Sequence, residues 1–199
     1  MKEELSILLQ AEYPLIYLVT HEEDRAEQQI AAIAQRENPN RQVFIWSVVY
    51  GFTEYGQTRT KANASTISPE AALQWMVNRK EPGIFVFKDL HPFITPNSPS
   101  VVRWLREAIA LFRTEKKSMV LMSPIQQVPV EIEKDVVSLD FDLPNMAELD
   151  QVLNRQLLKS GGLGNLSEAG REKLLKAALA SPAMRPRRST ARPTSPEVG

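Results

Sequence analysis

Short apolar runs alternate with amphipathic stretches along most of this chain. Between the runs, apolar residues recur three and four positions apart, which is the spacing of helices with one buried face. The alternation predicts an α/β fold of the RecA or AAA type, with a parallel sheet of about five strands flanked by helices. Five runs have the length and composition of buried strands: residues 15–19, 43–49, 84–87, 118–122 and 136–141.

The predicted topology places the loops that follow the strands along one edge of the sheet. Right-handed crossovers between parallel strands produce this arrangement, and ligands bind at that edge in open α/β sheets. Thr20 and Glu23 follow the first run with the spacing of a capping box, so we expect a helix to begin there. The polar stretch from Gly51 to Ser68 predicts a flexible loop.

The pattern changes after Asp142 to helical periodicity alone, so we expect an α/β domain over residues 1–142. Residues 143–179 predict part of a helical lid beside the sheet. Residues 180–199 hold four arginines and four prolines but few large apolar side chains. Such a segment buries too little surface to offset the entropy of ordering, so we expect a disordered tail.

Composition narrows the classes of function. The 199 residues have a formal net charge of zero, so no global charge favours nucleic acid or an anionic membrane as a partner. The chain has no cysteine, which excludes disulfides and thiolate metal sites. No apolar run approaches the ~20 residues that a membrane-spanning helix needs. We therefore expect a soluble protein.

The run from Ile84 to Phe87 ends in Lys88 and Asp89, as in a buried strand that delivers an acid to the sheet edge. In P-loop ATPases such an acid holds magnesium. Working ATPases have paired acids here, whereas this chain has one acid beside a lysine. Asp89 is therefore a candidate residual magnesium ligand, or else an aspartate that caps the next turn.

No complete phosphate-binding loop accompanies this acid. Residues 51–58 match G-x-x-x-x-G-x-T, but Gln57 stands where a lysine must reach the phosphates, and no helical pattern follows. The turn after the first strand, residues 20–24, has three acids and no glycine. Those acids would repel a triphosphate and would themselves occupy the helix dipole.

The two histidines offer a second kind of site. His21 and His91 both follow predicted strands, and with one strand between them their backbones would lie ~9.6 Å apart. Together with Asp89, and with Glu22 or Asp24, they could surround a cation of the zinc or manganese type. The alternative is that both are solvated loop histidines.

Several segments together resemble a known family. They are residues 84–93, Arg103-Trp104-Leu105-Arg106-Glu107, Val120-Leu121-Met122-Ser123-Pro124, and Asp142-Leu143-Pro144 with the helix that follows. In this order and spacing, over residues 1–179, they look like the N-terminal half of the cyanobacterial and plastid AAA-family ATPases called hypothetical chloroplast reading frame forty-six.

The resemblance implies a degenerate AAA-like domain without bound cofactor of its own. ATP and Mg²⁺ would bind in the C-terminal half of the family, which carries the phosphate loop, the paired metal acids and the arginine finger. Asp89 would match the metal-acid position and Ser123 the polar sensor position. The family is linked to regulation of photosynthetic carbon uptake, in the cytoplasm or the plastid stroma.

The chain departs from the family after Leu179, so we expect a truncated or frame-shifted product. We therefore expect a non-catalytic module that docks to an ATPase core or another protein partner, in a possible AAA-type oligomer. One alternative is a weak nucleotide- or metal-dependent enzyme that uses Asp89, His21 and His91. Another is a non-functional remnant.

Overall fold

The computed structural model describes residues 2–95, 97–141, 149–150, 154 and 168–180. The chain divides into two compact units, Met1–Asp142 and Leu143–Gly199. Most of the predicted lid, and the predicted tail beyond Ala180, lie outside the described residues. In the described part of the chain, every helix is too short or too polar to span a lipid bilayer.

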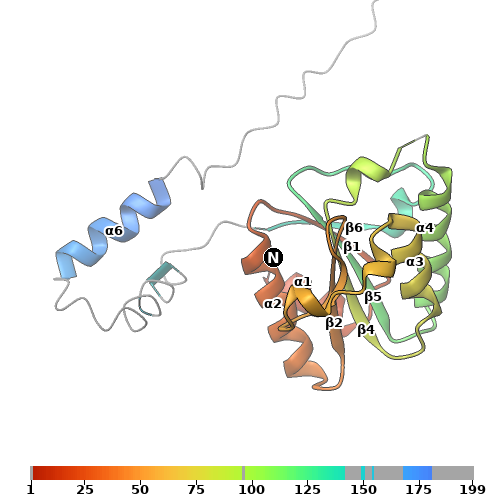
Figure 1. Ribbon diagram of the computed structural model, residues 1–199. Helices are drawn as coiled ribbons and strands as arrows, with labels where there is room; N and C mark the ends of the chain where they lie inside the picture. Colours follow the sequence, from red (N-terminus) through yellow and green to blue (C-terminus); the bar gives the residue numbers. More distant parts are fainter. Residues whose placement is uncertain (1, 96, 142–148, 151–153, 155–167, 181–199) are drawn as a thin grey trace, which may run out of the picture. The chain divides into compact units, whose positions relative to one another are not determined.

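A six-stranded sheet forms the centre of the first unit (Figure 1). Five strands run parallel, as the apolar runs predicted, and β3 is antiparallel to its neighbour β2. In spatial order the strands are β3 (Gly51–Glu54), β2 (Gln42–Ser47), β4 (Gly83–Lys88), β5 (Lys117–Ser123), β1 (Leu15–Val19) and β6 (Val137–Asp140).

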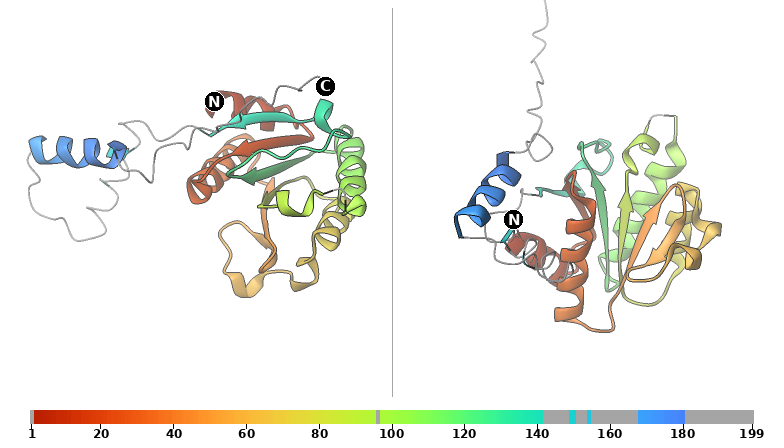
Figure 2. Two further views of the ribbon diagram at one scale, coloured as in Figure 1. Left: turned by 90° about the horizontal axis from the view of Figure 1, so that it is seen from above. Right: turned by 60° about the vertical axis from the view of Figure 1, so that its left-hand side comes forward.

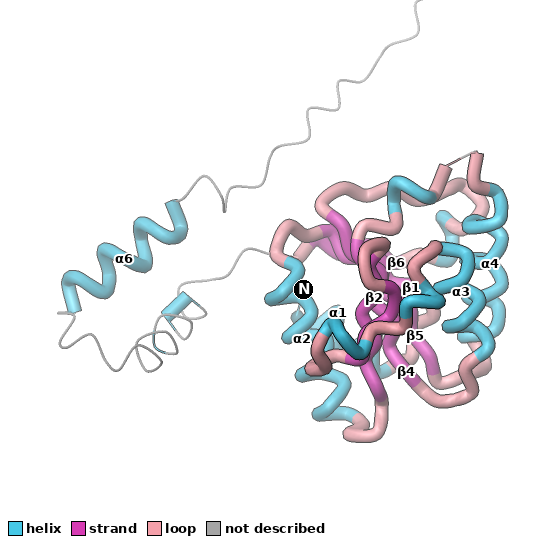
Figure 3. Tube along the Cα trace, viewed as in Figure 1, coloured by secondary structure: helices cyan, strands magenta, loops and turns pink. Residues whose placement is uncertain are grey.

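Helices cover both faces of this sheet (Figures 2 and 3). α1 (Lys2–Gln10) and α2 (Glu23–Glu37) pack on one face, and α3 (Pro69–Asn78) and α4 (Pro99–Phe112) pack on the other. The short 3₁₀ helices are η1 (Arg59–Lys61), η2 (Ala64–Thr66), η3 (His91–Phe93) and η4 (Glu133–Asp135). The two helical layers leave the carboxyl ends of the parallel strands at one edge.

The central strands explain why the sequence shows continuous apolar runs. All seven residues of β5 are buried, and so are all residues of β4 except Lys88. Ile84 and Val86 pack toward α1 and α2, whereas Phe85 and Phe87 pack toward α3 and α4. A strand covered on both faces needs apolar side chains at every position, which produces a run instead of an alternation.

The segment predicted to be a flexible loop contains structure instead. Residues 51–54 form β3, and the rest of the segment includes η1 and η2. The buried Thr66 holds this region, because its Oγ1 accepts the Phe52 N–H at 2.8 Å and its carbonyl accepts Trp46 Nε1–H at 2.6 Å. The prediction was wrong because the region is held by two buried residues far apart in the chain, Phe52 and Thr66, which leave no apolar periodicity.

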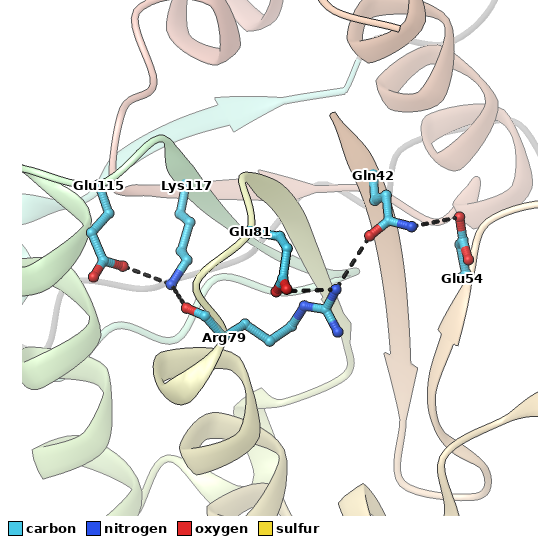
Figure 4. Close-up of polar contacts among 6 residues, drawn as sticks. All are labelled: Gln42, Glu54, Arg79, Glu81, Glu115 and Lys117. Atoms are coloured by element: carbon cyan, nitrogen blue, oxygen red, sulfur yellow. Dashed lines mark hydrogen bonds and ion pairs between the residues drawn. The ribbon is translucent and has the colours of Figure 1, made fainter. Parts of the chain in front are cut away.

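A polar network fixes the opposite, amino edge of the sheet (Figure 4). Lys117 is only 1% exposed, and its ammonium lies between the Arg79 carbonyl and Glu115, 2.6 Å from the carboxylate. The Arg79 guanidinium donates to Gln42 at 3.2 Å and lies over the rings of Phe44 and Trp75. Because the buried ammonium is paired and hydrogen-bonded, its burial is tolerated, and the loop before β4 is held to β5.

In the second unit, α6 (Glu168–Ala180) carries a bidentate ion pair. Arg171 donates to the two carboxylate oxygens of Asp150 at 2.6 and 2.7 Å, and also to Asn154 Oδ1 at 2.6 Å. The contact with Arg171 lowers the pKa of Asp150. These contacts join α6 to Asp150 and Asn154 within this unit.

The turn into β3 yields a test of this architecture. Gly51 has φ +75°, and a Cβ there would lie 2.3 Å from the Asn63 carbonyl oxygen and 2.6 Å from Thr66 Oγ1. Gly56 has a similar φ of +84° but open space around it. We expect Gly56→Ala to cost about 1 kcal/mol in the free energy of unfolding from backbone strain, and Gly51→Ala to cost at least about 3 kcal/mol because contacts must also break. Urea unfolding of both variants measures the difference, and equal losses would contradict the packing of β3 described above.

Candidate functional site

The candidate site lies at the carboxyl edge of β1, β4 and β5. In the strand order, β5 stands between β1 and β4. The loops after β1 and β4 are therefore separated by one strand, the arrangement assumed for the two histidines. Thr20 donates its N–H to the Ser123 carbonyl at 2.9 Å, and Asp89 donates its N–H to the Met122 carbonyl at 2.9 Å. Both loops are thus held to the end of β5.

Lys88 is the central charged group at this edge. Its ammonium lies 2.5 Å from Glu23 Oε2 and 2.9 Å from Glu27 Oε1. The lysine side chain is 23% exposed. Burial by itself lowers the pKa of Lys88, but the contacts with Glu23 and Glu27 outweigh this effect, so the net pKa is raised. β4 therefore ends in a cation that is bound by the first two turns of α2.

The start of α2 differs from the predicted capping box. Glu22 is the N-cap residue and makes no side-chain capping bond, and the helix begins at Glu23. The buried Thr20 hydroxyl instead accepts the Glu22 N–H at 2.9 Å, and Arg25 Nε donates to Glu22 Oε2 at 2.5 Å. The prediction was wrong because the chain turns for two more residues after β1 before the helix can begin.

This helix start has the wrong charge for a phosphate. Glu22, Glu23 and Asp24 lie at its first turn, where backbone N–H groups would otherwise attract an anion. The glycine-containing segment, residues 51–58, forms β3 and a turn, and η1 after it is only three residues long. Neither segment forms a cradle of backbone amides that faces a phosphate group.

Asp89 occupies an unusual backbone conformation beside Lys88. Its φ is +50°, in the left-handed region, and its side chain is 51% exposed. It does not cap η3, whose N-cap is Leu90 and which has no side-chain capping bond. Aspartate tolerates this conformation better than most residues do. A magnesium role for the exposed carboxylate stays a prediction.

The structure brings together two of the three predicted metal ligands. His91 Nδ1 lies 3.8 Å from Asp89 Oδ1, and this buried nitrogen has no hydrogen-bond partner. His21 is exposed and does not complete the set. Among the residues that the structure describes, no three His, Asp or Glu side chains are placed to hold a metal ion together. The proposed set of His21, His91 and Asp89 is therefore corrected to a histidine–aspartate pair, because adjacent loops at one edge need not direct their side chains to one point.

Ser123, the predicted sensor residue, is buried in a hydroxyl network with Tyr17. The two hydroxyl oxygens are 2.8 Å apart, and they lie 2.6 and 2.9 Å from the Ile125 carbonyl oxygen. The Gln127 N–H also donates to the Tyr17 hydroxyl, at 3.2 Å. The Tyr17 hydroxyl thus holds the loop after β5 to β1, and Ser123 binds the same carbonyl from the end of β5. Sequence reasoning missed Tyr17, although a tyrosine within a buried run signals a hydroxyl that needs a partner.

The sheet and its flanking helices define an α/β protein of the AAA type, and solved structures share this fold. One is in the HORMA–CdnC–Trip13 complex of E. coli, with a TM-score of 0.57 and 14% identity over 88% of this chain and 71% of that chain. Another is a DNA replication initiation factor, with a TM-score of 0.54 and 13% identity over 88% of this chain and 53% of that chain. At these identities the likeness shows the fold alone.

Sequence relatives narrow the class further. Residues 1–141 match the model of the SpoVK-like AAA ATPase N-terminal domain, so the chain belongs to that family. The AAA domain-containing protein ycf46 of Trieres chinensis is 29% identical over 153 residues, and that of Guillardia theta is 30% identical over 156 residues. Each match covers 77% of this chain, but the chain spans only 30% and 29% of those two relatives.

The Lys88 ion pairs generate a stability prediction. Lys88→Met would leave Glu23 and Glu27 close together without their cation, so we expect a loss of about 1 kcal/mol in the free energy of unfolding at pH 7, reduced by partial exposure. Because the folded-state pKa is raised, this stabilisation is present below the ordinary lysine pKa of about 10.4 and is lost as the pH rises through the folded-state value.

Urea unfolding of wild type and Lys88→Met at pH 7 and at high pH measures this contribution. The difference in the free energy of unfolding between the two proteins should become smaller at high pH. Lys80→Met is the matched control, because Lys80 is exposed. A Lys88 variant that is no less stable than the Lys80 control at pH 7 would contradict the role of the ion pairs.

Proposed function

We propose that this chain is a non-catalytic N-terminal module that docks to an ATP-hydrolysing core or to a client of that core. The observation that carries the proposal is the ion cluster of Lys88 with Glu23 and Glu27. It occupies the start of the helix after β1, where a phosphate-binding loop would have to present free amides and positive charge.

The charge arrangement supports a non-catalytic role. A triphosphate at the start of α2 would face Glu22, Glu23 and Asp24. The lysine at this edge is already paired with two carboxylates, and Arg25 is paired with Glu22. Nucleotide binding would therefore require breaking existing ion pairs as well as bringing like charges together.

The docking role rests on the family. The matching model is that of an N-terminal domain, and the relatives are about three times longer than the matched region. ATP and Mg²⁺ would bind in the remaining part of such relatives. We infer that the module regulates that core within an AAA-type oligomer. The process that it serves would be photosynthetic carbon uptake, in the cytoplasm or the plastid stroma.

Two observations favour a second candidate, a weak nucleotide- or metal-dependent enzyme. Asp89 is held in the left-handed region, and strained residues cluster at functional sites. The buried, unpartnered Nδ1 of His91 lies beside its carboxylate. These two side chains, without His21, would be the acid–base or metal-binding groups of such an activity.

Calorimetric titration with Mg-ATP separates the two candidates. We expect no saturable heat for the 199-residue chain at ATP concentrations up to about 1 mM, the upper range of ordinary substrate constants. Saturable binding that Asp89→Ala abolishes would overturn the non-catalytic proposal in favour of the enzyme.

Docking is tested separately with the remaining part of the Guillardia theta relative. We expect this chain to co-purify with that part and to change its rate of ATP hydrolysis. Size-exclusion chromatography of this chain alone is the control, because aggregation would mimic association and would favour the interpretation as a non-functional remnant. A monomeric chain that neither binds that part nor alters its rate would contradict the docking role.

A further inference from the structure

A cavity of about 260 Å³ opens between α2 and the β2–β3 hairpin, apart from Asp89 and His91. The start of α2 forms one wall with Asp24 and Glu27, together with Lys88 from β4. The hairpin and the residues after it form the rest, with Tyr50, Tyr55 and Arg59 among them. Neither the family nor the proposed function assigns a role to this cavity.

The charges in this cavity favour a cationic occupant. Three acids line it, Asp24, Glu27 and Glu54, against the two cations Lys88 and Arg59. Lys88 is already paired with Glu27 and with Glu23, an acid that lies next to the cavity without lining it. The Asp24 side chain is exposed, and among the described residues it makes no hydrogen bond or ion pair. An incoming cation would therefore find an uncommitted carboxylate, whereas an anion would be repelled.

The cation that fits this cavity is a planar organic group and not a metal ion. Within the described residues no three carboxylates or histidines converge as metal ligands. The chain already places one guanidinium at this cavity. Arg59 Cζ lies 4.9 Å from the centre of the Tyr50 ring, and Arg59 Nη1 donates to the Tyr50 hydroxyl at 3.2 Å. The Tyr55 ring, 39% exposed, offers a further aromatic surface. A guanidinium is planar, so it stacks flat on an aromatic face and binds a carboxylate through two parallel donors, a geometry that a compact ammonium lacks.

Two exposed valines between lining residues favour a side chain carried by a polypeptide over a free small molecule. Val48 and Val49, next to the lining residues Ser47 and Tyr50, are 45% and 64% exposed. An arginine that enters the cavity from an extended segment would place its apolar neighbours against these two valines. We propose that this cavity binds an arginine side chain of a protein partner, with Asp24 and Glu27 as the carboxylates and Tyr55 as the stacking ring.

This inference rests on the proposed docking role, because it names the chemistry by which a partner is held. It is tested on the full chain with N-acetyl-Val-Arg-Val-amide as the probe, followed by backbone amide NMR. We expect saturable shifts concentrated at the cavity residues. The matched peptide with citrulline, which keeps the shape but removes the charge, should bind at least about tenfold more weakly, the effect of one charge-assisted contact.

Two variants test whether the arginine peptide binds at this cavity. Asp24→Asn should weaken the arginine peptide severalfold, whereas Asp140→Asn, which changes an exposed acid at the end of β6, should not. Unchanged thermal unfolding of Asp24→Asn would show that its fold is intact. Equal binding of the arginine and citrulline peptides, or no shifts at cavity residues up to about 10 mM peptide, would overturn the inference. Either result would leave the co-purification experiment unaffected, so the two proposals fail separately.

Discussion

The ion pairs between Lys88 and the first turns of α2 are the constraint on which the rest of the site depends. They join the end of β4 to the helix after β1, and they place a cation between Glu23 and Glu27. Without that cation, the acids at the start of α2 would repel one another. When Lys88 is present, its ion pairs with Glu23 and Glu27 occupy the region that would have to bind phosphate.

The sheet was predictable from the sequence because its central strands are buried on both faces. Each continuous apolar run corresponds to a parallel strand, and β5 is buried along its whole length. β3 was not predictable, because four residues with two buried positions give no periodic signal. Its stability depends on Thr66, twelve residues beyond the end of the strand at Glu54, and a contact of that kind is invisible to local pattern analysis.

For the candidate site, the sequence indicated the edge but not the directions of the side chains. The loops after β1 and β4 do lie one strand apart, as expected. Yet His21 does not join His91 and Asp89, and Ser123 turns to Tyr17 and the Ile125 carbonyl. The sequence shows Lys88 only as a neighbour of Asp89, because its partners on α2 lie more than 60 positions away in the chain. Spacing along the chain therefore located the groups but could not pair them.

The ion pairs at this edge require that Lys88 is charged and held by Glu23 and Glu27 in solution. An NMR titration that follows the Lys88 Cε and Nζ resonances in the folded protein measures this most directly. The structure predicts a pKa above that of an ordinary lysine side chain, and a lower pKa when Glu23 and Glu27 are both replaced by glutamine. A wild-type Lys88 pKa at or below the ordinary value would show that burial outweighs the ion pairs, and would contradict the central claim.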